Sequence, residues 1–240
     1  SDYDVVSKYG VKINSPAGDF EFKPKQVVKA VSDYEGEADY ILIATKALPE
    51  IDLGSLIKPA VSKNTVLFLV QNGIGMEASL TSEFESNKII SALAFICVSK
   101  IKPGIVDHQD YGRLSLGDYP EGISKKANEL KLLFERSGVS CEVTEKIQHM
   151  RWKKLVWNIP FNGLSVLKNG ASTKDLLASK ESTQEVESLM NEVVLVAKAD
   201  GFPIEDDFVL KNIDYTKNMI PYKTSMLLDY ENNRPMELEA

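Results

Sequence analysis

The sequence predicts an α/β protein in which a sheet of parallel strands is followed by an all-helical region. Two observations lead to this prediction. In residues 1–146 short apolar runs rich in β-branched residues alternate with stretches of helical spacing, the pattern of a doubly wound parallel sheet. From residue 147 onward strand signals largely disappear and long helical patterns replace them. We therefore expect two domains, residues 1–146 and residues 147–240.

The predicted elements of the first domain follow the chain in order. Residues 11–13 and 20–22, separated by Ser-Pro-Ala-Gly, predict a hairpin. Residues 40–45 and 65–70 are continuous apolar runs, which are typical of strands buried on both faces of a parallel sheet. The further elements predicted here are helices at 48–61 and after Gly75, strands at 89–98 and 112–117, a helix at 124–136 closed by Gly138, and a strand at 139–143.

The second domain shows apolar residues at helical spacing over long stretches. Helices are predicted at residues 147–167, at 183–200 with Gly201 as the stop signal, and from 206 onward. Residues 236–240 form a helix-like acidic pattern that starts near Pro235 and reaches the last residue. These apolar helices would form either a homodimer interface or only an internal core.

Composition excludes several classes of protein. Apolar residues make up 43% and charged residues 26% of the 240 residues, a globular balance rather than a disordered one. The net charge of −7 makes binding to nucleic acid or to an anionic membrane surface unexpected. No stretch has the ~20 apolar residues that span a bilayer, and no secretion signal is visible.

Cysteine and histidine usage points to a reducing compartment and to no metal site. Cys97 and Cys141 cannot build a disulfide framework, so a cytoplasmic location is expected. His108 and His149 have no ligand spacing to a second metal-binding residue, so no metal centre is expected.

Two polar residues directly follow predicted strands of the sheet. Lys46 follows residues 40–45, and Asn72 follows residues 65–70. In an open parallel sheet ligands bind outside the carboxyl ends of the strands, so both side chains are expected in the binding crevice. Gly73 would let the backbone approach a ligand closely. The alternative is that Asn-Gly forms an ordinary turn and that Lys46 is a solvated loop residue.

The strongest local pattern lies in the helix predicted at residues 147–167. Lys154, Asn158 and Asn162 stand at i, i+4 and i+8, on one helical face, within an otherwise apolar stretch. Buried amide and ammonium groups cost on the order of several kcal/mol unless they find partners. A ligand carrying carbonyl, carboxylate and hydroxyl groups would supply these partners. The alternatives are a polar seam satisfied by another helix, or a face exposed to solvent.

A third group of polar residues lies near the end of the sequence. Ser225 and Glu237 are twelve residues apart, close to one face if a helix ran continuously between them. Asn232-Asn233-Arg234-Pro235 interrupts that helix. Taken alone, Glu237 would be a solvated surface carboxylate.

Together these motifs resemble the ketopantoate reductase (2-dehydropantoate 2-reductase) family. The resemblance is carried by Ser1-Asp2-Tyr3, Ala44-Thr45-Lys46, Gln71-Asn72-Gly73-Ile74-Gly75, Arg151-Trp152-Lys153-Lys154-Leu155 with Asn158 and Asn162, and residues 223–229 with Met236-Glu237. It implies a Rossmann-like NADP-binding domain at residues 1–146. It also implies an all-α substrate domain at residues 147–240, which resembles the C-terminal domains of 6-phosphogluconate dehydrogenases.

The resemblance also implies an activity and a set of site residues. Members of the family use NADPH to reduce the ketone of ketopantoate, a small 2-keto acid, to pantoate for pantothenate and coenzyme A synthesis. The implied general acid is Lys154, because an ammonium group can stabilise and protonate the alkoxide that hydride addition creates. The other implied roles are Glu237 as its catalytic partner, Asn158, Asn162 and Ser225 in substrate binding, and Lys46, Asn72 and Gly73 at the cofactor.

The sequence departs from the family pattern in two respects. Gly163 stands where the family commonly has proline, and no Gly-x-Gly-x-x-Gly motif opens the first domain. We expect that motif upstream of Ser1 and further helices after Ala240, in a longer polypeptide. Two other functions stay open, namely a reductase of another small 2-keto acid on the same fold and a non-catalytic binding or regulatory protein.

Overall fold

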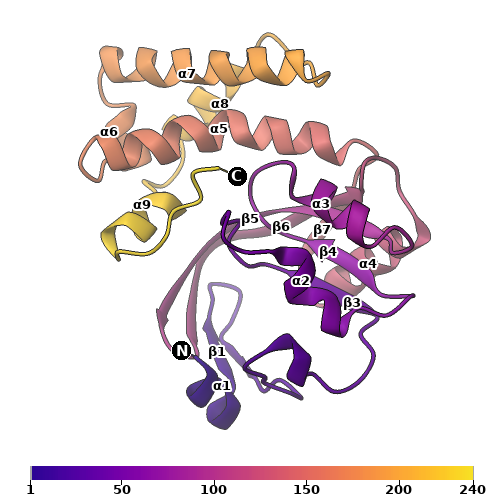
Figure 1. The fold of residues 1–240 in the computed structure, drawn as a ribbon. Coiled ribbons are helices and arrows are strands. Elements are labelled where there is room, and N and C mark those ends of the chain that lie inside the picture. The colour runs from indigo at the N-terminus through magenta and orange to yellow at the C-terminus, as the bar shows by residue number, and fades with distance from the viewer. Residues whose placement is uncertain (1, 240) are drawn as a thin grey trace. The chain divides into compact units, whose positions relative to one another are not determined.

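A computed structural model describes residues 2–239 and divides the chain into two compact units (Figure 1). The sheet unit comprises residues 1–45, 51–71 and 77–147, and the helical unit comprises residues 46–50, 72–76 and 148–240. Ser1 and Ala240, named in the sequence predictions, lie outside the described residues. No helix within the described residues combines the length and apolar character needed to cross a membrane.

The sheet unit interleaves strands with short helices, as the sequence predicts. Its elements are α1 (Tyr3–Tyr9), β1 (Val11–Asn14), β2 (Phe20–Phe22), η1 (Val31–Asp33), β3 (Tyr40–Ile43), α2 (Leu53–Ile57), η2 (Lys58–Ala60), β4 (Val66–Leu69), α3 (Met76–Glu83), β5 (Ile89–Lys102), β6 (Ile105–Asp118), α4 (Lys125–Arg136) and β7 (Ser140–Val143).

These strands form one sheet in the order β2-β1-β6-β5-β4-β3, with β7 paired to β6. Strands β3, β4 and β5 run parallel to one another, and β1 and β7 run parallel to β6. The α/β fold class with parallel strands is therefore confirmed. The long antiparallel pairing of β5 with β6, which turns at Gly104 with a φ of 72°, is not among the predicted features.

Two local predictions in this unit need correction. Leu42 of β3 is 55% exposed, although the strand was expected to be buried on both faces. Among the described strands β3 pairs only with β4 and ends the sheet. The helix expected from residue 48 begins at Leu53, because the Asp52 carboxylate accepts a hydrogen bond from the Ser55 backbone N–H and caps the helix there.

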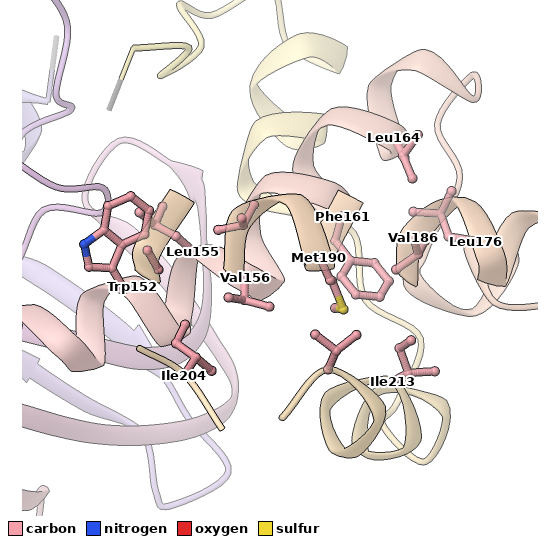
Figure 2. Packing of buried hydrophobic residues seen from close by; sticks show 13 residues of the cluster. Trp152, Leu155, Val156, Phe161, Leu164, Leu176, Val186, Met190, Ile204 and Ile213 are labelled. Atoms are coloured by element: carbon pink, nitrogen blue, oxygen red, sulfur yellow. The ribbon is translucent and has the colours of Figure 1, made fainter. Parts of the chain in front are cut away.

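The helical unit consists of α5 (Ile147–Leu167), α6 (Thr173–Leu176), α7 (Lys180–Ala199), α8 (Phe208–Lys217) and α9 (Ser225–Glu231). The bounds of α5 are those that the sequence predicts. Figure 2 shows Phe161 of α5, Met190 of α7 and Ile213 of α8 in one apolar cluster, and all three are nearly fully buried. This core fixes α5, because burying a large apolar side chain contributes roughly 1.5–3 kcal/mol.

The segment after α9 differs from its prediction. Residues 236–239 are not helical, so the predicted helix near Pro235 is wrong. Contacts outside any helix hold this segment instead. The carbonyl oxygen of Pro235 accepts a hydrogen bond from Lys46 Nζ, and a carboxylate oxygen of Glu237 accepts one from the Ala47 backbone N–H.

Candidate active site

A cavity of about 300 Å³ lies within the helical unit. Its polar wall brings together side chains from the loop after β4, from α5, from α9 and from the segment after α9. These are Asn72, Asn158, Asn162, Ser225, Asp229 and Glu237. Leu155, Ile159 and Met226 contribute apolar surface. A small molecule with both polar and branched apolar groups fits such a lining.

The polar face of α5 contributes to this cavity in the register that the sequence predicts. Asn158 and Asn162 line the cavity, one helical turn apart. One turn before them, Lys154 Nζ donates a hydrogen bond of 2.9 Å to Asn72 Oδ1. The structure thus joins the lysine of α5 to Asn72, in the loop that follows the fully buried strand β4.

The ammonium group of Lys154 is held in an environment that disfavours its charge. Burial is the main cause, and the nearby positive charge of Arg151 acts in the same direction, while the negative charge of Glu237 opposes both. Together they lower the pKa of Lys154 to about 8. A lysine with such a pKa exchanges a proton near neutral pH far more readily than an ordinary lysine.

Arg151 is a site residue that the sequence analysis did not single out. Its side chain is 1% exposed, and its guanidinium donates a hydrogen bond of 2.9 Å to the carbonyl oxygen of Gly73. Gly73 has a φ of 93°, a conformation that favours glycine. Arg151 therefore fixes the loop that carries Asn72. A signal was present, since Arg151 precedes Lys154 by three residues on the same apolar helix.

Ser225 and Glu237 both reach the cavity, but no continuous helix connects them. Ser225 is the first residue of α9, whose start is capped by the buried Thr224 side chain. Glu237 lies beyond that helix, and its Oε1 accepts a hydrogen bond of 2.8 Å from the Ala47 backbone N–H.

Lys46 and Lys154 are the two predicted site residues that are not among the residues lining the cavity. Lys154 is hydrogen-bonded to the lining residue Asn72, whereas Lys46 has other partners. The Lys46 Nζ lies 2.5 Å from Asp229 Oδ2 and donates a hydrogen bond of 2.6 Å to the Pro235 carbonyl oxygen. Asp229 is a second residue that the sequence analysis missed, because nothing in the local pattern of α9 relates it to a lysine 183 positions earlier. The cofactor role of Lys46 stays a prediction.

The loop between β4 and α3 carries one further signal. Gly73-Ile74-Gly75-Met76-Glu77-Ala78 has the spacing Gly-x-Gly-x-x-Ala, a form of the dinucleotide-binding fingerprint. Three residues separate it from the end of β4, and it leads into α3. Gly75 has a φ of 86°, and a Cβ atom added there would meet no atom within 4 Å. The backbone at this position is therefore open to a ligand.

Family models and named relatives point to the same protein family. Residues 1–121 match the family model described as ketopantoate reductase PanE/ApbA, and residues 146–240 match its C-terminal model. A 2-dehydropantoate 2-reductase of Nostoc sp. is 37% identical over 245 residues, which cover all of this chain and 76% of the relative.

Solved structures extend the comparison. A 2-dehydropantoate 2-reductase from Methylococcus capsulatus superimposes with a TM-score of 0.90 at 42% identity, covering 99% of this chain and 76% of that one. The corresponding enzyme from Geobacter metallireducens gives 0.92 at 35% identity, covering 100% of this chain and 79% of that one. With both family models matched along its length, the chain belongs to the ketopantoate reductase PanE/ApbA family.

Proposed function

We propose that the protein reduces 2-dehydropantoate (ketopantoate) to pantoate with NADPH, in the synthesis of pantothenate and coenzyme A. The observation that carries this proposal is the placement of Lys154. Its ammonium group, with a pKa of about 8, is hydrogen-bonded to Asn72 at a cavity lined by two further asparagines, a serine and a glutamate. The named relatives support the choice of substrate.

Lys154 acts as the general acid in this reaction. NADPH, when bound, supplies the hydride that attacks the carbonyl carbon. Negative charge then develops on the carbonyl oxygen, and Lys154 Nζ stabilises that charge and donates its proton to the oxygen, which becomes the new hydroxyl group. The lowered pKa makes this transfer easier than it would be from an ordinary lysine.

The remaining cavity residues hold the substrate. Asn158 and Asn162 offer amide N–H donors and carbonyl acceptors, and Ser225 offers a hydroxyl group. Glu237 offers a carboxylate that can accept a hydrogen bond from a substrate hydroxyl, while its charge counteracts the effect of Arg151 on Lys154. Apolar side chains such as Ile159 and Met226 suit the branched carbon of the substrate.

The residues present fit the nicotinamide end of the cofactor. Asn72 and Gly73 stand at the carboxyl end of the parallel strand β4, and the backbone at Gly75 is open. We assign Asn72, Gly73 and Lys46 to cofactor binding on this basis, with Lys46 following β3. The two family-model matches support the assignment of residues 1–146 to the dinucleotide and residues 147–240 to the substrate.

We also propose that the enzyme works in the cytoplasm, as a homodimer, on small 2-keto acids and without nucleic acid or membrane partners. Cys97 and Cys141 are both buried free thiols, which suits a reducing compartment. Exposed apolar side chains on the helices of the helical unit, such as Leu195 and Leu210, suit contact with a second copy. Sedimentation of the purified protein measures this oligomeric state.

A substrate panel tests the proposed activity. The full-length protein is given NADPH or NADH with 2-dehydropantoate, 2-oxoisovalerate, pyruvate or phenylglyoxylate, and the loss of reduced-cofactor absorbance is followed. We expect the highest kcat/KM with NADPH and 2-dehydropantoate. A higher value with another acid would assign the chain to a different 2-keto acid. Absence of turnover with every acid, alongside measurable binding of NADPH, would favour a non-catalytic binding protein.

A further inference from the structure

A cluster of charges surrounds Asp229 on α9. The Asp229 side chain is 10% exposed, and its two carboxylate oxygens have different cationic partners. Oδ2 lies 2.5 Å from Lys46 Nζ, and Oδ1 lies 3.0 Å from Arg234 Nε. A buried carboxylate with two cations is costly to desolvate and adds little net stability by itself. A contribution to stability therefore does not account for the placement of Asp229 between two cations.

The two partners of Asp229 lie at the segment that leads to Glu237, since Arg234 begins that segment and Lys46 contacts it at Pro235. Lys46 Nζ donates a hydrogen bond of 2.6 Å to the Pro235 carbonyl oxygen, and the Arg234 backbone N–H donates one of 2.9 Å to the Asp229 carbonyl oxygen. The residue after Lys46 contacts Glu237 itself, because the Ala47 backbone N–H donates a hydrogen bond of 2.8 Å to the Glu237 carboxylate.

This segment depends on these contacts for its conformation. Residues 234–237 belong to no helix or strand, so no ladder of backbone hydrogen bonds fixes them. Pro235 and Arg234 are both exposed, so packing contributes little there. The side chains of Lys46, Asp229 and Arg234 thus supply much of what orders the backbone before Glu237.

We propose that Lys46, Asp229 and Arg234 form a positioning cluster that fixes residues 235–237 and holds the Glu237 carboxylate at the cavity, where its charge acts on Lys154. The catalytic consequence rests on the proposed reductase function, whereas the electrostatic consequence does not. In this assignment Asp229 is a positioning residue that acts through Glu237, and Lys46 has the same positioning role in addition to the one assigned to it at the cofactor.

The charges around Lys154 give the cluster a measurable signature. Arg151 lowers and Glu237 raises the pKa of Lys154, and Asn72 Oδ1 accepts a hydrogen bond from Lys154 Nζ. If Glu237 moves away, burial and Arg151 still lower the pKa of Lys154, and the opposing effect of Glu237 is lost. Loosening the cluster should therefore lower the pKa of Lys154 further, in the direction given by Glu237→Gln.

The experiment titrates Lys154 directly in the full-length protein. NMR of protein labelled with ¹³C at lysine Cε follows each lysine against pH, and Lys154→Met identifies the resonance. Lys46→Met and Asp229→Asn should both lower the pKa of Lys154 relative to wild type, by no more than Glu237→Gln does. Lys46→Arg, which keeps the charge, should restore most of the wild-type value.

Kinetics provide a second readout. With 2-dehydropantoate we expect kcat to fall roughly 10- to 100-fold in Lys46→Met and Asp229→Asn, the scale of a misplaced catalytic group. The KM for NADPH should change less than kcat in Asp229→Asn, whereas Lys46→Met also removes a side chain that we assign to the cofactor and should raise this KM. The matched control is Glu185→Gln, which breaks the exposed ion pair of Glu185 with Lys168 in the same unit and should change neither readout.

The outcomes separate this inference from the proposed function. An unchanged Lys154 pKa in either Lys46→Met or Asp229→Asn, while Glu237→Gln lowers it, overturns the cluster. An unchanged pKa in Glu237→Gln also overturns it. If Asp229→Asn does not fold, Lys46→Met decides, because the Lys46 side chain is 33% exposed and its loss is tolerable. A wild-type protein inactive on 2-dehydropantoate contradicts the proposed function, yet the titration still decides the positioning role.

Discussion

In the sheet unit the fully buried carboxylate of Glu77 accepts a hydrogen bond of 2.6 Å from the Ser91 hydroxyl, inside the core. In the helical unit buried and partly buried charged groups are arranged around a cavity. Asp229 and Glu237 line it, and Lys154 is bound to Asn72 in its wall. Both units withdraw charged groups from water, and in the helical unit a cavity lies beside them. Burial of a charge alone therefore does not identify a functional group.

Two neighbouring lysines on α5 show the same difference between a charge with a structural partner and a charge beside the cavity. Lys153 forms an ion pair of 2.8 Å with Glu205, whose side chain is 58% exposed. Lys154 differs from Lys153 chemically. Its partner is an amide, its ammonium group is buried, and its pKa is lowered to about 8. Replacing each lysine in turn tests whether the two differ in function.

The largest effect is expected from Lys154→Met. Loss of a general acid lowers kcat by roughly 10²- to 10⁴-fold, because no other group protonates the developing alkoxide. Steady-state assays with NADPH and 2-dehydropantoate measure this loss. Lys153→Met is the matched control and should retain kcat within about threefold, since exposed ion pairs contribute little. Equal losses in the two variants would remove the distinction between them.

The second effect is a dependence of rate on pH. Lys154 is an acid only while protonated, so kcat/KM should be constant well below its pKa of about 8, fall to half at the pKa, and fall about tenfold per pH unit well above it. An ordinary lysine would place this limb near pH 10.4. The profile is measured in the wild type and in Lys154→Met, in which the limb should be absent. A limb shared by both proteins would have to come from another group.

These expectations show what the sequence could and could not reveal. Periodicity predicted the bounds of α5 and the shared face of Lys154, Asn158 and Asn162, because a helix imposes its own spacing on neighbouring residues. It missed the pairing of Lys46 with Asp229, since an ion pair between distant segments leaves no trace in local pattern. The outer half of the β5–β6 hairpin was missed because its polar and charged residues break the apolar run.

The helix predicted at residues 236–239 is wrong for a related reason. Its acidic and apolar residues suit a helix, but hydrogen bonds from Lys46 and Ala47 hold it in another conformation. Local propensity is worth less than about 1 kcal/mol per residue, so a few tertiary contacts override it. The wrong helix prediction therefore points to the site, because the residue that those contacts hold is Glu237.

The smallest effect on catalysis is expected from the sheet unit. Glu77→Ala removes the acceptor of the Ser91 hydroxyl and leaves a buried donor without that partner, which should lower the free energy of unfolding by about 1–3 kcal/mol. Glu77→Gln keeps an acceptor oxygen and should lose less. Urea unfolding gives the stability and steady-state assays give kcat, which should stay within about twofold in both variants. A large loss of kcat in a folded Glu77→Gln protein would mean that buried charge in the sheet unit also serves the reaction, and the two units would then differ less than their geometry suggests.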